Sequence, residues 1–170
     1  MTEHTLILIR HAKSSWAEVM PDHERPLNHR GRRDAAAIGR LLDRRGVRAD
    51  LALVSSAART RETWRRAAQA GALAASVIET DVLYDAEYTD IVEAVRGLPP
   101  DVATAILVAH FPAIPDTVAY LAEGRGPQAA WDMLRGGCPT ATVITLSVPG
   151  EWADIDEVGA DLVDVETPRG

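Results

Sequence analysis

Three short runs dominated by apolar and β-branched residues most constrain how this chain can fold. They occupy residues 5–9, 50–54 and 104–109, and each has the length of a buried strand rather than of a helix. A strand that is apolar at almost every position must be covered on both faces, as in parallel sheets. Segments with helical periodicity separate the three runs. The sequence therefore predicts an α/β protein, a three-layer α/β/α sandwich with a mostly parallel central sheet.

The rest of the chain can be assigned around these strands. We expect a helix from an Asn28 cap to about Arg45, a second over 57–70 capped by Ser56, a third from a Thr89 cap to about residue 96, and a fourth over 115–122. Further strands are predicted at 77–79, at 142–148 and, as an edge strand, within 152–167. Residues 14–27 contain two prolines and read as a loop. A length of 170 residues favours one domain over residues 1–170.

Charge and cysteine content narrow the class of function. The net charge of −7 argues against a nucleic-acid-binding protein. Residues 1–66 nevertheless hold 14 Lys and Arg against 8 Asp and Glu, which suggests a local anion site. The single cysteine, Cys138, excludes an internal disulfide and a cysteine-rich metal site, and fits a cytoplasmic protein. The apolar runs are too short for a signal peptide or a membrane span, so no membrane association is expected.

Residues suited to phosphate chemistry follow three of the predicted strands. Arg10 and His11 end the first strand, Arg59 lies in the first turn of the helix after the second, and His110 ends the third. The carboxyl ends of parallel strands meet at one edge of the sheet, where α/β proteins bind ligands. Arginine matches phosphate oxygens with a planar fork, and neutral imidazole is a nucleophile toward phosphorus. A helix N-terminus near Ser56 would add N–H donors.

These motifs resemble those of the histidine phosphatase (phosphoglycerate mutase-like) superfamily. Residues 6–12 (Leu-Ile-Leu-Ile-Arg-His-Ala) resemble its Arg-His signature. Residues 54–63, which contain Ser-Ser-x-x-Arg-Thr, resemble its second motif, and residues 107–110 resemble the strand that supplies its second histidine. The resemblance implies a phosphoglycerate mutase-like fold. It also implies that His11 is the covalent phosphoryl acceptor and that Arg10, Arg59 and His110 bind the phosphoryl group.

Two further segments are similar to the short SixA-like phosphohistidine phosphatases. These are residues 10–16 (Arg-His-Ala-Lys-Ser-Ser-Trp) and residues 22–27 (Asp-His-Glu-Arg-Pro-Leu). In that group the arginine of the second segment approaches the phosphate, a role that passes to Arg25, whose alternative is a surface pair with Asp22. Lys13 and Trp16 are expected at the rim of the substrate site, while Trp131 is expected to be buried.

Two positions depart from the family pattern. The usual Gly-His-Asn of the third motif reads Ala-His-Phe here, so Phe111 replaces a polar positioning group; it points either into the core, which we expect, or toward the substrate as an apolar wall. Many relatives carry a glutamate acid between the second and third motifs. Glu87 is the candidate here, with a solvated loop carboxylate as the alternative.

The sequence thus predicts a metal-independent phosphatase without a cofactor, acting through a covalent phosphohistidine on His11. The expected substrate is a protein phosphohistidine, because a protonated imidazole is a much better leaving group than an alkoxide, which needs a positioned acid. The chain also has no long insertion to form a lid. The alternatives are a small-molecule phosphomonoesterase and a phosphate-binding module without turnover. The sequence predicts no particular oligomeric state.

Overall fold

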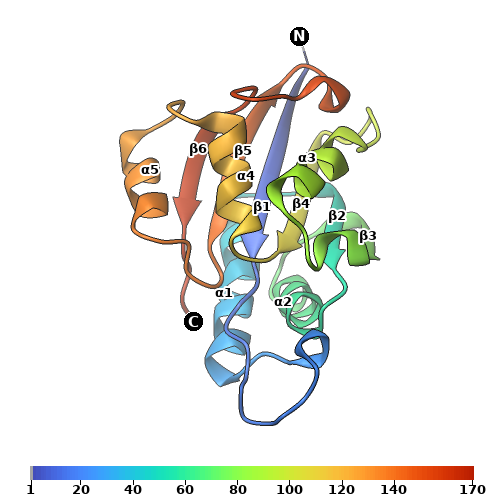
Figure 1. Ribbon diagram of the computed structural model, residues 1–170, viewed down its shortest axis with the longest axis vertical. Helices are drawn as coiled ribbons and strands as arrows, with labels where there is room; N and C mark the ends of the chain where they lie inside the picture. The colour runs from blue at the N-terminus through green and yellow to red at the C-terminus, as the bar shows by residue number, and fades with distance from the viewer. Residues whose placement is uncertain (1) are drawn as a thin grey trace.

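A mixed sheet of six strands forms the centre of the protein in the computed structural model, which describes residues 2–170 (Figure 1). The strand order is β3-β2-β4-β1-β5-β6. Strands β3, β2, β4 and β1 are parallel, and β5 is antiparallel to both β1 and β6. The predicted α/β class with a mostly parallel sheet is therefore confirmed. The strands are β1 Glu3–Arg10, β2 Ala49–Ser55, β3 Ala74–Thr80, β4 Thr104–Ala109, β5 Val143–Pro149 and β6 Asp161–Glu166.

Helices cover both faces of the sheet. On one face lie α1 (His29–Arg44) and α2 (Ala58–Gln69); on the other lie α3 (Tyr88–Arg96), α4 (Ala113–Ala122) and α5 (Gln128–Arg135) (Figure 1). Short 3₁₀ turns occupy Asp22–Glu24, Asp81–Leu83 and Trp152–Asp154. Within the described residues, no helix combines the length and the apolar character that crossing a membrane requires.

The alternation of side chains along β1 explains the two cores. Leu6 and Leu8 point to the layer of α3, α4 and α5, while Ile7 and Ile9 point to the layer of α1 and α2. All four are at most 1% exposed. Burial of both faces stabilises a strand only if both faces are apolar. The gain is roughly 25 cal/mol per Å² of buried apolar surface. This is why the run at residues 5–9 predicted a central strand.

Several predicted boundaries were wrong in detail. The N-cap of α2 is Ala57 rather than Ser56, and that of α3 is Glu87 rather than Thr89. The fourth helix begins at Ala113, two residues before the predicted start. Helix α5 was not predicted, because its eight residues lie among glycines and carry a short apolar face. The predicted burial of Trp131 is confirmed: it is 6% exposed, and its indole N–H donates to the carbonyl of Arg125.

The sheet places three chain segments at one edge. In the strand register, Arg10 of β1 pairs with Ala109 of β4, and Val54 of β2 pairs with Val108 of β4. The residues that follow β1, β2 and β4 therefore emerge next to one another at the carboxyl ends of these parallel strands.

Candidate active site

His11 follows β1 directly and is buried, with 7% of its surface exposed. Its Nδ1 lies 2.7 Å from the backbone carbonyl of Ala12. A carbonyl can only accept, so Nδ1 carries the proton and Nε2 keeps its lone pair. Burial is the main cause that lowers the pKa of His11 from 6.5 to about 3, and nearby His110, Arg59 and Arg10 lower it further. At neutral pH the side chain is an uncharged imidazole with a free Nε2, as a nucleophile requires.

The backbone around His11 is fixed by helix α2. The amide of Ala12 donates to the Thr63 hydroxyl at 3.0 Å, and that hydroxyl donates to the carbonyl of Arg59 at 2.7 Å. Both Ala12 and Thr63 are almost fully buried. The loop that carries His11 is thereby tied to the helix turn that carries Arg59.

His110 lies beside His11 at the end of β4. The two ring centroids are 5.3 Å apart. The Nε2 of His110 lies 2.7 Å from the Ser55 hydroxyl at the end of β2. Burial and the charge of Arg59 lower the pKa of His110 to about 4, so this ring is also neutral at pH 7. If Ser55 donates to Nε2, the other nitrogen, Nδ1, carries the proton and can donate to an oxyanion.

Arg10 is held between a backbone carbonyl and an aromatic ring. Its Nη1 donates to the Cys138 carbonyl at 2.6 Å, and its guanidinium carbon lies 4.9 Å from the centroid of Phe111. Phe111 is 53% exposed, so the prediction that it points into the core was wrong. Phe111 lies two residues beyond the end of β4, and stacking on a guanidinium gives its ring a favourable contact outside the core.

Asp22 links the other two arginines of the site. Its Oδ1 accepts from Arg25 Nε at 3.1 Å and Nη2 at 3.0 Å, and its Oδ2 accepts from Arg59 Nη2 at 3.1 Å. The backbone carbonyl of Asp22 accepts from Arg59 Nη1, and the Tyr84 hydroxyl donates to Oδ2 at 2.7 Å. Arg25 pairs with Asp22, as one of its two interpretations predicts, but it is 7% exposed rather than at the surface. Its approach to the phosphate stays a prediction.

The charges of this cluster favour a doubly charged anion. The hydrogen bond from Tyr84, followed by the bonds from the two arginines, lowers the pKa of Asp22 to about 2, so its carboxylate is ionised. Three guanidinium groups, from Arg10, Arg25 and Arg59, stand against this one carboxylate, and both histidines are neutral. The net charge of +2 complements a dianionic phosphoryl group.

Three buried polar atoms of the cluster have no protein partner among the described residues. They are Arg10 Nε, Arg59 Nε and His110 Nδ1. Buried polar atoms are almost always paired, so an unpaired set from three separate elements indicates a site for a polar ligand. Two of these atoms are N–H donors of cations, and phosphoryl oxygens are acceptors that suit them.

The other predicted site residues differ in how they relate to this cluster. Lys13 is exposed and makes no side-chain hydrogen bond to the residues that the structure describes. Trp16 is 74% exposed and lies over the Arg25 guanidinium at 3.6 Å. Ser56 does not face the cluster as a helix cap; its hydroxyl accepts from His23 Nε2 at 2.8 Å and donates to Asp81 at 2.5 Å.

Glu87 does not reach the cluster. It is exposed and occupies the N-cap of α3, where its backbone N–H donates to Asp90 at 2.8 Å. The residue of this segment that does reach the site is Tyr84. Its ring centroid lies 5.8 Å from that of His110, and its hydroxyl bonds Asp22.

Sequence reasoning missed the parts played by Asp22, Tyr84 and Ser55. Asp22 stands inside the SixA-like segment 22–27, where it was expected only as a partner of Arg25. The contact of Tyr84 with it has no signal that a single chain interprets. Ser55 precedes a second serine, and only the structure shows which of the two meets His110. The carbonyl of Cys138 has no sequence signal, because backbone acceptors depend on chain path alone.

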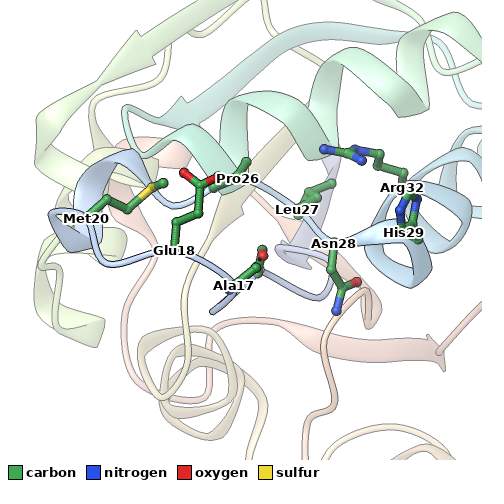
Figure 2. A pocket seen from close by; sticks show the side chains of 9 residues that line it. Ala17, Glu18, Met20, Pro26, Leu27, Asn28, His29 and Arg32 are labelled. Carbon is green, nitrogen blue, oxygen red and sulfur yellow. Dashed lines mark hydrogen bonds between the residues drawn. The ribbon is translucent and has the colours of Figure 1, made fainter.

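A separate cleft lies beside the site, under the loop that joins β1 to α1. Figure 2 shows its lining side chains on the loop and at the start of α1. The volume of the cleft is about 400 Å³. The lining residues are Ser15, Ala17, Glu18, Met20, Pro26, Leu27, Asn28, His29 and Arg32. Neither histidine of the phosphate cluster lines it, so the cleft and the cluster are different surfaces.

Comparison with known proteins agrees with this geometry. The model of the histidine phosphatase superfamily (branch 1) matches residues 6–99, the stretch that carries Arg10, His11 and Arg59. The chain belongs to the histidine phosphatase superfamily. An uncharacterised protein of Mycobacterium tuberculosis (strain ATCC 25618 / H37Rv) is 33% identical over 162 residues, covering 95% of this chain and 100% of that protein.

Solved structures extend the likeness to the whole fold. A candidate phosphohistidine phosphatase SixA from Nakamurella multipartitia has a TM-score of 0.84 and 33% identity, covering 99% of this chain and 98% of that one. Another from Agrobacterium tumefaciens has a TM-score of 0.81 and 26% identity, covering 97% and 98%. A phosphoglycerate mutase from Plasmodium falciparum shares the fold, with a TM-score of 0.63 at 16% identity and coverage of 100% and 94%. The chain is SixA-like within its superfamily, and its likeness to the two SixA proteins supports a phosphatase function.

Proposed function

We propose that this protein is a phosphohistidine phosphatase that acts on a histidine-phosphorylated protein. The single observation that carries the proposal is the pairing of a neutral His11, whose Nε2 is free, with three arginines and a second neutral histidine. The SixA-like neighbours support the substrate class, since both are described as candidate phosphohistidine phosphatases. A cytoplasmic location and a single-domain organisation over residues 1–170 stay predictions.

In the first step, Nε2 of His11 attacks phosphorus and forms a P–N bond while the P–N bond of the substrate breaks. The substrate imidazole, which carries a proton on its other ring nitrogen, takes the bonding electron pair and leaves as a neutral imidazole. The phosphorylated ring of His11 is then an imidazolium, whose Nδ1 keeps its proton and donates a hydrogen bond to the Ala12 carbonyl. Arg10, Arg59 and His110 stabilise the equatorial oxygens, and Arg25 acts through Asp22 and Arg59.

In the second step, water attacks phosphorus and the P–Nε2 bond breaks. The electron pair returns to Nε2, and inorganic phosphate keeps the oxygen of the water. Because the leaving imidazole of His11 is cationic, this step needs no separate acid. Metal independence is part of the proposal: guanidinium groups supply the positive charge, and excess chelator should leave turnover unchanged.

The test is phosphoenzyme trapping combined with substrate comparison. A phosphohistidine peptide should label wild-type protein with an acid-labile phosphoryl group that then turns over, and His11→Ala should abolish both labelling and hydrolysis. His29→Ala, at an exposed histidine of α1, is the matched control and should behave as wild type.

Three outcomes would count against the proposal. Far faster hydrolysis of small phosphate esters than of phosphohistidine would assign a phosphomonoesterase instead. Binding without labelling would assign a phosphate-binding module. Undiminished labelling of His11→Ala would remove the nucleophile.

A further inference from the structure

Two exposed aromatic side chains lie against arginines of the phosphate cluster. Trp16 is 74% exposed, and its ring lies 3.6 Å from the Arg25 guanidinium carbon. Phe111 is 53% exposed, and the centroid of its ring lies 4.9 Å from the guanidinium carbon of Arg10. We call this pair, Trp16 and Phe111, the aromatic rim. The rim comes from two loops far apart in sequence, one after β1 and one after β4.

The contacts of the rim connect it to the reacting groups. Phe111 is the neighbour of His110, and the arginine beneath it precedes His11. Trp16 lies on Arg25, which shares the Asp22 carboxylate with Arg59. Both rings of the rim therefore adjoin guanidinium groups of the cluster in which the phosphoryl group would bind.

The exposure of the rim favours a large partner over a small one. Sites for small molecules enclose most of the ligand, whereas both rim side chains are more than half exposed. Aromatic side chains are enriched at the centres of protein interfaces, where covering their faces stabilises a complex. Stacking on an arginine also holds each ring in one orientation, which lowers the entropy lost on binding.

We propose that Trp16 and Phe111 are specificity-determining residues that bind the polypeptide around the phosphorylated histidine. This inference rests on the proposed function. The occupant is the substrate polypeptide, because charge complementarity places its phosphoryl group in the cluster that both rings adjoin. The rim would thus make the site prefer a protein-borne phosphohistidine over a free phosphoryl compound that contains the same bond.

The experiment compares two substrates that share the P–N bond. One is a histidine-phosphorylated peptide and the other is phosphoramidate, which has no polypeptide to contact the rim. Trp16→Ala and Phe111→Ala should each lower the ratio of kcat/KM for the peptide to kcat/KM for phosphoramidate by about 3- to 10-fold, the range expected for loss of an aromatic contact. Trp16→Phe, which keeps a ring, should restore most of the ratio.

Val19→Ala is the matched control. Val19 is a fully exposed apolar residue of the same loop and should leave the ratio unchanged. If wild-type protein hydrolyses both substrates and the rim variants keep its ratio, the rim proposal is overturned and the proposed function stands. If wild-type protein hydrolyses neither substrate, the proposed function fails and the rim proposal fails with it.

Discussion

The neutral state of His11 predicts how stability depends on pH. The folded pKa of about 3 lies below the ordinary value of 6.5, so unfolding takes up a proton between these values. The contribution of neutral His11 to the free energy of unfolding is therefore complete above pH 6.5 and is lost as pH falls toward 3. From pH 7 to pH 5 the unfolded chain binds a proton at this histidine and the folded protein does not. The free energy of unfolding therefore falls by about 2 kcal/mol over this range.

His11→Asn should remove this part of the pH dependence. The variant should lose about 2 kcal/mol less than wild type between pH 7 and pH 5, while titrations elsewhere in the chain cancel in the comparison. Urea unfolding followed by tryptophan fluorescence measures both losses. Buffers must lack phosphate and sulfate, because an oxyanion bound at the arginines would stabilise the folded state.

The same substitution at exposed His29 serves as the control for the chemical change. Equal losses for wild type and His11→Asn would refute the reasoning, because they would mean that His11 is not held neutral by burial. A larger loss in the variant would refute it as well.

Three further predictions follow from particular contacts. Asp22→Asn should lower the free energy of unfolding at pH 7 by up to about 1 kcal/mol, since the carboxylate is half exposed. In urea unfolding, this difference between variant and wild type should fade as pH falls from about 4 to about 2, because the pKa of Asp22 is depressed in the folded state. A difference that grows in acid would contradict the prediction. Glu87→Gln should leave kcat unchanged even for esters with poor leaving groups, since Glu87 caps α3; a sharp fall in kcat would restore it as the acid. Gly31→Ala should lower the free energy of unfolding by roughly 1–3 kcal/mol or more, because a Cβ there would lie 2.0 Å from the Lys13 carbonyl oxygen. A thermal unfolding midpoint equal to that of wild type would refute the predicted clash.

The site shows where prediction from sequence ends. Arg10, His11, Arg59 and His110 follow strand ends, and the register of parallel strands brings strand ends together, so their meeting could be predicted. The Asp22 bridge joins side chains separated by 37 and 62 residues through a loop. No periodicity specifies such a contact, because the loop conformation depends on the helices and turns that it touches.

Phe111 gives the clearest contrast. An apolar residue after a buried strand is expected to continue into the core, because sequence records hydrophobicity but not the direction of the chain. In the structure the chain turns at the end of β4, and the ring of Phe111 packs against the guanidinium of Arg10 instead. The sequence alone determined the strands, the layers and which residues of the strand ends gather at the candidate site, since local patterning and burial dictate them. Only the tertiary structure decided the tautomer of His11, the pairing of the arginines and the exposure of the rim, since these depend on contacts between distant segments.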